Sequence, residues 1–341
     1  MKMSMKWIPC ELHTHTVHSD AQHTLLEMAE KARELDIEWI ALTDHNTTSG
    51  HLEREDVTLK TGLQIIKGLE WTTFHGHMLT LGISKYVDWR NLGIQDIDKG
   101  IKGVHEQDGV VGIAHPFRVG SPMCTGCYWE YEIKDWNEID YIEVWSGVFP
   151  SIKQTNQRAF NWWTDVLNAG YKVSATSGRD WHHSNPVDGP LSITYLGLPD
   201  SESKLEGDEL ETALVSAIKK GAISVTLGPL LIVNFHVPGM DKVFEMGETL
   251  LVKEMTEELV TVNISIDFST RKRHWKLPEQ DLEVRINSNL GVLAVEKVNE
   301  NTPNCSIEIL MSQIKWLRAE LYGVIHECRT LIAFTNPIYG D

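Results

Sequence analysis

The chain has 341 residues, of which 42% are hydrophobic and 23% are charged, a balance typical of an ordinary globular protein. It carries 31 lysine and arginine residues against 48 aspartate and glutamate residues, which gives a net charge of −17. This charge argues against a nucleic-acid groove or an anionic membrane surface as a partner, because both need concentrated basic residues. It leaves room for a small anionic substrate, because bound cations can dominate the field inside a site.

The N-terminal segment has no apolar stretch of the length that a signal peptide needs, and no apolar run approaches the roughly 20 residues of a membrane-spanning helix. The five cysteines are odd in number and scattered, which favours a reducing compartment. Cys124 and Cys127 have the spacing of a metal or redox pair, but no second pair lies near them in the sequence, so free thiols are the better interpretation. We therefore expect a soluble, cytoplasmic protein.

The first two thirds of the chain alternate segments typical of buried strands with segments typical of amphipathic helices. The strands are predicted, in chain order, at residues 39–42, 63–66, 110–114, 141–144 and 172–175. Apolar residues at helical spacing predict helices across residues 25–35, 159–167 and 210–218. Thr24 is the expected N-cap of the first helix, and Gly170 and Gly221 are the expected ends of the other two. Repeated strand–helix units predict an α/β architecture with a parallel sheet, open or closed into a barrel.

Residues 223–341 follow a different pattern, in which short strand-like segments are separated by glycine, proline, asparagine and charged turns. These segments lie at residues 231–236, 259–268, 282–287 and 306–310. No helical period of useful length lies between them. The sequence therefore predicts two domains, an α/β domain at residues 1–222 and an all-β domain at residues 223–341, the second a small sandwich packed on the first.

Residues that can bind a metal ion accompany nearly every predicted strand of the α/β domain. In chain order they are His13, His15, Asp20, His45, Glu70, His77, His115, Asp180 and His182. The predicted strand at residues 141–144 carries a further carboxylate, Glu143. Because the carboxyl ends of strands in α/β folds are where sites are assembled, residues far apart in the sequence can converge there.

The spacing of these residues favours a cluster of cations. His13 and His15 are two residues apart, so on an extended chain both side chains point to one face and can bind one cation; Asp180 and His182 repeat this spacing. Mixed imidazole and carboxylate ligands suit zinc, iron or manganese. With roughly four ligands per cation, this set is large enough for two or three cations that share bridging carboxylates. Each motif alone has an ordinary explanation, such as a capping Asp44 or a turn at His115, but the repetition at strand after strand does not.

These motifs, in this order, resemble those of the PHP family, the polymerase and histidinol phosphatase metallohydrolases. The matching segments are His13-Thr14-His15-Thr16, Ser19-Asp20, Thr43-Asp44-His45, Gly68-Leu69-Glu70, Gly76-His77, Ala114-His115-Pro116 and Asp180-Trp181-His182. The resemblance covers roughly residues 7–222. It implies that the first domain is a distorted (β/α)7 barrel.

The resemblance also implies how the ligands divide among the cations. Three sites are expected, formed by His13, His15, Glu70 and Asp180; by Glu70, His115 and His77; and by Asp20, His45 and His182. Glu70 would bridge the first two sites. Two positions depart from the family's pattern: Asp20 stands where some members have histidine, and Arg179 stands where a small residue is usual. The first departure puts the occupancy of the third site in doubt, and the second could alter the pocket.

Two segments of the all-β domain, residues 316–320 and 333–339, resemble the C-terminal domain of a PHP branch that includes carbamate-insecticide hydrolases. This part of the chain supplies no obvious metal ligand. Its favoured interpretation is a β-sandwich that packs on the first domain and mediates assembly, which leaves a homo-oligomer open.

The predicted activity is hydrolysis of a small, anionic phosphoester by water that two or three divalent cations convert to a bridging hydroxide. The alternative substrate is a carboxyl ester, amide or carbamate, and an alternative of another class is a metal-binding regulatory module without turnover. A proofreading nuclease is disfavoured by the charge of −17. Asp180 or His182 would move a proton to the leaving group. Arg118 and Arg179 are the candidates to bind a substrate anion.

Overall fold

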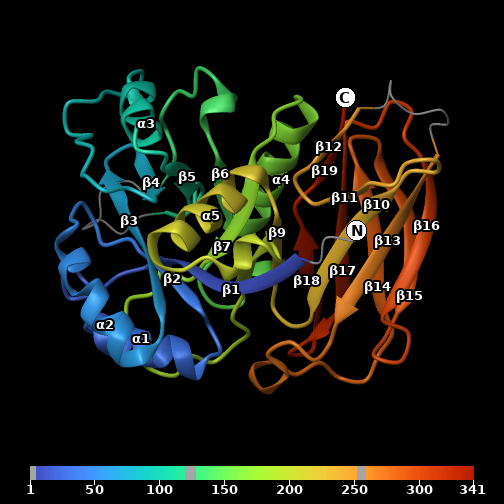
Figure 1. Cartoon of the computed structure of the whole chain (residues 1–341), viewed down its shortest axis with the longest axis horizontal. Helices are drawn as coiled ribbons and strands as arrows, with labels where there is room; N and C mark the ends of the chain where they lie inside the picture. Colours follow the sequence, from blue (N-terminus) through green and yellow to red (C-terminus); the bar gives the residue numbers. More distant parts are fainter. Residues whose placement is uncertain (1–4, 120–127, 252–258) are drawn as a thin grey trace.

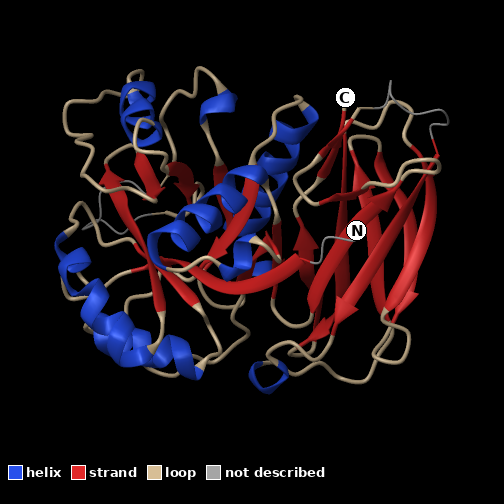
Figure 2. Cartoon of the chain, in the orientation of Figure 1, coloured by secondary structure: helices blue, strands red, loops and turns tan. Residues whose placement is uncertain are grey.

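The computed structural model describes residues 5–119, 128–251 and 259–341, so the predicted thiol pair Cys124 and Cys127 lies outside the described residues. The chain forms an α/β part and a β part that lie side by side (Figure 1). Helices are concentrated in the first part, and the second consists almost wholly of strands and loops (Figure 2). None of the described helices is long and apolar enough to cross a membrane.

The α/β part contains the helices and strands that carry the candidate ligands. Its elements are β1 (Met5–Thr14), α1 (Leu25–Glu34), β2 (Trp39–Leu42), α2 (Arg54–Thr61), β3 (Gln64–Thr73), β4 (Gly76–Leu81), α3 (Ile97–His105), β5 (Val110–Ala114), β6 (Tyr141–Ser146), α4 (Gln154–Asn168), β7 (Ser174–Gly178), β8 (Ile193–Pro199), α5 (Gly207–Lys220) and β9 (Ile223–Thr226). All five predicted strands and all three predicted helices are present, with boundaries shifted by a few residues. Helices α2 and α3 were not predicted.

Helix α1 shows how local sequence sets an element boundary. The Thr24 hydroxyl accepts a hydrogen bond from the backbone N–H of Glu27, and the Glu27 carboxylate accepts one from the backbone N–H of Thr24. This capping box satisfies two donors that the first turn of a helix leaves free. Leu25, Met28, Ala29 and Ala32 then form the buried face. The predicted N-cap is confirmed.

The strands of the α/β part follow one another around a single sheet in the order β1-β2-β3-β4-β5-β6-β7, with β8 on the other side of β1. Neighbours β1 to β3 are parallel, as are β5 to β7, but β4 is antiparallel to both β3 and β5. A mixed α/β fold is thus confirmed. A strict repeat of seven strand–helix units is not, because β3 and β4 form a hairpin without a helix between them.

The sheet turns back on itself beyond β7. The backbone N–H of Trp181 donates to the carbonyl of His13 at 3.1 Å, and the N–H of His15 donates to the carbonyl of Trp181 at 3.0 Å. These two bonds bring the segment after β7 against the end of β1. The first and last groups of candidate ligands, about 165 positions apart in sequence, therefore meet in space.

The β part consists of strands that pair mostly antiparallel, and the pattern of residues 223–341 predicted its all-β character. Its strands are β10 (Leu230–His236), β11 (Val243–Glu245), β12 (Thr249–Leu250), β13 (Leu259–Asp267), β14 (Leu282–Ser288), β15 (Gly291–Val298), β16 (Asn304–Leu310), β17 (Trp316–Ile325), β18 (Cys328–Thr335) and β19 (Ile338–Gly340). One four-stranded sheet has the order β11-β10-β13-β16, and β17 and β18 pair in the other. Strand β9 pairs with both β8 and β18 and so joins the two parts of the chain. The division at residues 222 and 223 stays a prediction.

The segment that follows β18 packs against the outer edge of β7. The Asn336 side chain, wholly buried, accepts a hydrogen bond from the N–H of Ala175 at 2.7 Å and donates one to its carbonyl at 2.8 Å. Thr194 does the same two residues further along β7, where its hydroxyl contacts the N–H of Ser177 at 2.9 Å and its carbonyl at 3.0 Å. Side chains thus replace the missing neighbouring strand.

We expect Asn336→Ala to destabilise the protein by about 2–6 kcal/mol, because it leaves two buried backbone groups of Ala175 without partners, at about 1–3 kcal/mol each. Urea unfolding measures the change. The exposed Asn301→Ala is the control and should stay within about 0.5 kcal/mol of the unmodified protein. Equal stability of the two variants would show that Asn336 does not support β7.

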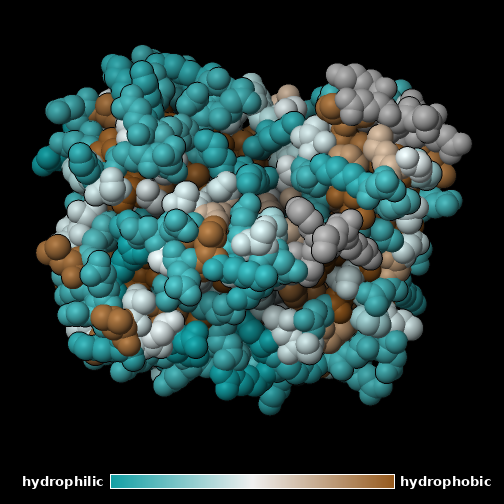
Figure 3. Space-filling model, viewed as in Figure 1, coloured by the Kyte–Doolittle hydropathy of each residue, from teal (hydrophilic) through white to brown (hydrophobic). Residues whose placement is uncertain are grey.

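The face of the molecule seen in Figure 3 is mainly hydrophilic, with small hydrophobic patches separated by polar residues. This agrees with the excess of acidic residues in the sequence. The large apolar side chains are mostly buried between the sheets and the helices.

Candidate metal centre

The strands bring the candidate ligands to one edge of the α/β sheet. His13 lies near the end of β1, His115 directly follows β5, and His45 and Asp180 come within three residues of the ends of β2 and β7. His77 is near the start of β4, which lies at the same edge because β4 runs antiparallel to its neighbours. The structure thus gathers residues that the sequence spreads over most of the α/β part.

The gathered side chains form three groups, in each of which the ligand atoms lie within 4.8 Å of one another. The groups are His13, His15, Glu70 and Asp180; Glu70, His77 and His115; and His15, Asp20, His45 and His182. The first two have the members that the family resemblance implied. The third has the expected three residues and adds His15.

Glu70 lies between the groups, and its two carboxylate oxygens face different candidate ligands. Its Oε1 is 2.9 Å from Nδ1 of His77 and 3.3 Å from Nε2 of His115. Its Oε2 is 3.3 Å from Nε2 of His13 and 2.8 Å from Nδ1 of His45. Burial raises the pKa of the Glu70 carboxyl, but the surrounding histidines, first His13, bring this pKa well below its usual value. Glu70 is therefore an ionised, fully buried carboxylate with the geometry of a bridge.

Several buried ligand atoms at the centre lie close to other ligand atoms but form no hydrogen bond of acceptable geometry in the described part of the chain. They are His13 Nε2, His15 Nδ1 and Nε2, Glu70 Oε2, His115 Nδ1 and Asp180 Oδ1. Buried polar atoms in folded proteins nearly always have partners, and exceptions call for an explanation such as an ion. Imidazole nitrogens and carboxylate oxygens are the donors that zinc, iron and manganese accept. The residues present therefore fit a cluster of divalent cations.

The three groups differ in their access to solvent. The side chains of His13, His15 and Glu70 are 0% exposed, whereas that of Asp20 is 57% exposed. Nε2 of His182 lies 3.1 Å from Asp20 Oδ1, and its side chain is 28% exposed. The third group is thus the open side of the centre, where a substrate can approach.

Backbone conformation directs two of the ligands inward. Asp180 has φ of 54° and His115 has φ of 26°, both in the left-handed region that residues with a side chain rarely adopt. His115 directly follows β5, and one residue separates Asp180 from the end of β7. Such strained residues persist where the surrounding structure over-determines them, which is common at functional sites.

The two arginines that the sequence offered as anion ligands lie in different surroundings. Arg118 contacts the Asp180 carboxylate and its side chain is 51% exposed. Arg179 is almost buried: its Nε donates to Glu11 Oε2 at 3.0 Å, and its guanidinium lies 3.5 Å from the centre of the Trp181 ring. Glu11 thus engages Arg179 behind the centre, and Arg118 is the arginine in contact with a candidate ligand.

Sequence reasoning did not assign a role to Glu143, Asp44 or Lys153. Glu143 Oε2 lies 2.7 Å from Nδ1 of His13, and its only signal was a carboxylate inside an otherwise apolar strand. Asp44 accepts bonds from the backbone N–H and the hydroxyl of Thr16 at 2.7 and 2.8 Å, so it anchors the loop after β1.

Lys153 carried no sequence signal because it lies outside the motifs. Its Nζ donates to the carbonyl of Ser146 at 3.2 Å, at the end of β6. Burial and then the nearby Arg118 lower the pKa of the Lys153 ammonium. It is thus a second cation close to the centre.

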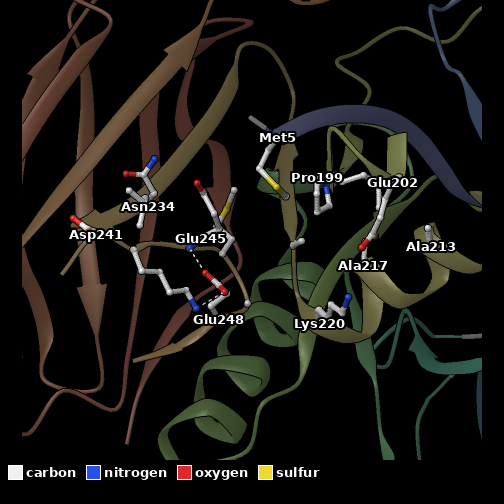
Figure 4. Close-up of a pocket in the computed structure, with 17 residues that line it drawn as sticks. Met5, Pro199, Glu202, Ala213, Ala217, Lys220, Asn234, Asp241, Glu245 and Glu248 are labelled. Atoms are coloured by element: carbon white, nitrogen blue, oxygen red, sulfur yellow. Dashed lines mark hydrogen bonds and ion pairs between the residues drawn. The ribbon is translucent and has the colours of Figure 1, made fainter. Parts of the chain in front are cut away.

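A cavity of about 770 Å³ opens over the centre. Its lining combines candidate ligands with Arg118 and with an apolar wall that includes Val148, Val187 and Leu191. A second cavity, of about 830 Å³, lies where β8 and α5 meet β10 to β12, and its rim carries Lys220 and Glu248 (Figure 4). None of the metal-ligand groups found in the described residues lines this second cavity. The candidate metal ligands are therefore gathered at the first cavity.

Comparisons with known proteins agree with the geometry of the centre. Residues 11–109 match the family model of the PHP domain. An uncharacterized protein of Methanocaldococcus jannaschii is 28% identical over 131 residues, which are 33% of this chain and 69% of that protein. A phosphoribosyl 1,2-cyclic phosphate 1,2-diphosphodiesterase of Eggerthella lenta is 28% identical over 81 residues, which are 22% of this chain and only 31% of that enzyme.

The fold has a solved counterpart over nearly its whole length. A two-domain protein from Bacteroides vulgatus, described as containing a predicted PHP-like metal-dependent phosphoesterase, has a TM-score of 0.53 and 15% identity to this chain. The similarity covers 98% of this chain and 96% of that one, so it includes the β part. At this identity it establishes the fold alone. The PHP resemblance is confirmed, whereas the carbamate-hydrolase branch stays a prediction.

Proposed function

The chain carries a PHP domain, and from this premise we propose that it is a metal-dependent hydrolase that cleaves a small, anionic phosphoester with two or three divalent cations of zinc, manganese or iron. The observation that carries the proposal is the fully buried Glu70, whose two oxygens face different groups of ligands. A carboxylate in this position joins neighbouring cation sites into one centre.

Different residues of the chain would hold the cations and move the proton. His13, His15, Glu70 and Asp180 would hold the first cation, Glu70, His77 and His115 the second, and Asp20, His45 and His182 the third. Bound cations of this kind polarise a phosphoryl oxygen and make water acidic enough to attack near neutral pH. With the third site unfilled, His182, partly exposed beside Asp20, is proposed to pass a proton to the leaving oxygen.

Arg118 supplies the contact that selects an anion. Its guanidinium contacts Asp180 and its side chain is half exposed, so it can turn from Asp180 to a phosphoryl oxygen without losing a charged partner. Lys153 adds positive charge nearby. The phosphoesterase descriptions of the relatives support the same substrate class. Arg179, engaged by Glu11, is proposed to hold the loop that carries Asp180 and not to contact the substrate.

The apolar wall of the cavity favours a second candidate. Val148, Val187 and Leu191 could contact the apolar part of a carboxyl ester or carbamate, and the same cations would polarise its carbonyl. Metal binding without turnover is the remaining alternative.

An assay with three nitrophenyl substrates, the phosphomonoester, the phosphodiester and the acetate, together with naphthyl methylcarbamate, separates these candidates. The protein is reconstituted with Zn²⁺, Mn²⁺ or Fe²⁺, and we expect turnover of a phosphoester with at least one of them. Turnover of the acetate or the carbamate alone would contradict the phosphoester assignment. Bound metal without turnover of any substrate would favour the regulatory alternative.

We expect Arg118→Met to lower kcat/KM for the phosphoester by about 10- to 150-fold, since a hydrogen bond to a charged group contributes about 1.5–3 kcal/mol. Steady-state kinetics measures the change. Arg90→Met removes an exposed arginine that pairs with Asp88, belongs to no metal-ligand group of the described residues and does not line the cavity over the centre, so it should leave kcat/KM unchanged. Similar kinetics for both variants would remove Arg118 from substrate binding.

A further inference from the structure

The imidazole of His13 is held from behind by a carboxylate that belongs to none of the three ligand groups. Nδ1 of His13 lies 2.7 Å from Glu143 Oε2, while Nε2 faces Glu70 Oε2 at 3.3 Å and Asp180 Oδ1 at 3.5 Å. The two ring nitrogens therefore have separate roles, one toward the centre and one away from it.

Glu143 lies on the Nδ1 side of the His13 ring, away from the ligand groups that Nε2 faces. It lies in the middle of β6, is 1% exposed, and is not a member of any metal-ligand group in the described residues. Its Oε2 is taken by His13, and its Oε1 has no hydrogen-bond partner among the described atoms. Placing a carboxylate here costs desolvation energy, and among the described residues its one side-chain hydrogen bond is with His13.

The neighbouring strand leaves space for this contact. A Cβ atom on Gly178, at the end of β7, would lie 2.5 Å from Cβ of His13 and 2.7 Å from Glu143 Oε2. Real Cβ atoms do not approach other atoms so closely, so any side chain here would push the carboxylate and the imidazole apart. The contact between His13 and Glu143 therefore depends on Gly178, which lies in a neighbouring strand and has no side chain.

The other imidazoles of the centre are oriented differently. Nδ1 of His182 contacts the backbone carbonyl of Asp180, and Nδ1 of His77 contacts Glu70, itself a candidate ligand. Among the imidazoles of the described residues at the centre, His13 is the one whose far nitrogen contacts a carboxylate from outside the groups. His13 also belongs to the first group, in which His13, His15 and Glu70 are buried.

We propose that Glu143 is a positioning residue for the metal centre: its carboxylate accepts a hydrogen bond from the N–H at His13 Nδ1. This hydrogen bond fixes the tautomer in which Nε2 presents its lone pair to a cation. A carboxylate behind a ligating histidine fixes the ring's orientation and makes the imidazole a stronger donor. The inference rests on the cation binding of the proposed function, and it concerns neither the substrate nor the reaction.

Metal affinity tests the proposal without any substrate. Protein freed of metal is titrated with Co²⁺ and, in competition with a chromophoric chelator, with Zn²⁺. Glu143→Met has a similar volume but no acceptor, and we expect it to weaken the tightest site by about 10- to 100-fold, the usual cost of losing such a contact. Glu143→Gln keeps an acceptor oxygen, and we expect it to recover most of the affinity and of the Co²⁺ absorption spectrum.

A matched control separates this role from mere burial. Glu211 is a buried carboxylate, 3% exposed, that contacts Arg54 and Lys67 away from the centre. Glu211→Met should lower the urea midpoint and leave the affinity for Co²⁺ and Zn²⁺ unchanged.

The outcomes distinguish the proposed role of Glu143 from the proposed hydrolase function. Wild-type affinity in folded Glu143→Met would overturn the role of Glu143 even if the protein hydrolyses phosphoesters. Equal loss in Glu143→Met and Glu143→Gln, with no rescue, would also overturn it. If Glu143→Met does not fold, Glu143→Ala provides the second variant, and it should weaken the same site because it also removes the acceptor of the His13 Nδ1 hydrogen bond. A chain that binds these metals with the expected pattern but cleaves no ester would retain the inference and lose the proposed function.

Discussion

Replacing both His13 and His15 with alanine should abolish turnover of the phosphoester substrate, with kcat falling by at least about a thousandfold. The expectation follows from the geometry: the first ligand group loses both of its nitrogen donors, and His15 is shared with the third group. The double variant therefore removes donors from two of the three groups. Catalysis that depends on cation-activated water then loses its source of nucleophile.

The metal content of the purified double variant should fall together with its activity. Elemental analysis measures the metals, and circular dichroism checks the fold. The matched control replaces two exposed histidines of the β part, His236 and His326, and should keep both metal and activity. A folded variant of His13 and His15 that retains full activity would defeat the ligand assignment. The single His15→Ala variant covers the case in which the double variant does not fold, because it leaves the contact between His13 and Glu143 in place.

The ligand set could be predicted from the sequence because strand ends impose a simple geometry. His45 and His115 come within three residues of the ends of apolar strands, so their position at the edge of the sheet required no knowledge of the packing. His77 was harder to place, because β4 runs antiparallel and its first residues, not its last, lie at that edge. The hairpin between β3 and β4 therefore decided its position, and a strict strand–helix repeat would have placed it wrongly.

The supporting residues could not be predicted in the same way. Glu143 reaches His13 across 130 positions in sequence, and the space for the contact depends on Gly178 in a third strand. The burial of Arg179 against Glu11 likewise depends on how β7 meets β1. Such contacts are set by tertiary packing, for which the alternation of polar and apolar residues gives no signal.

Helices α2 and α3 were missed for local reasons. Helix α2 buries only Val57, so it lacks the repeated apolar face on which the prediction of amphipathic helices depends. Helix α3 contains two glycines, Gly100 and Gly103, which weaken any helical prediction. Gly100 is retained because a Cβ there would lie 2.8 Å from the ring of Trp71, so close packing replaces helix propensity as the deciding factor.

Removing the metal should inactivate the protein and also lower its thermal stability. One or two buried ligand atoms of each of His13, His15, Glu70 and Asp180 have no hydrogen bond among the described residues, so cations that bind them stabilise the folded state and have little affinity for the unfolded chain. At a free metal concentration about a thousand times Kd, each site adds about 4 kcal/mol to the free energy of unfolding. For a large domain each kcal/mol raises Tm by about 2–4 °C, so one filled site should raise Tm by roughly 10 °C.

Differential scanning calorimetry of chelated and reconstituted protein measures this difference, and an activity assay on the same samples follows turnover. Activity and Tm should recover together as Zn²⁺ or Mn²⁺ is added back, because both depend on the same buried donors. Added Ca²⁺ is the control: it prefers sites made of oxygen ligands alone, and most donors here are imidazoles, so it should restore neither. If chelation changes activity but leaves Tm unaltered, the essential cation binds at the exposed third group, where Asp20 and His182 are already solvated. If neither quantity responds to chelation or reconstitution, the gathered imidazoles and carboxylates do not form a metal centre.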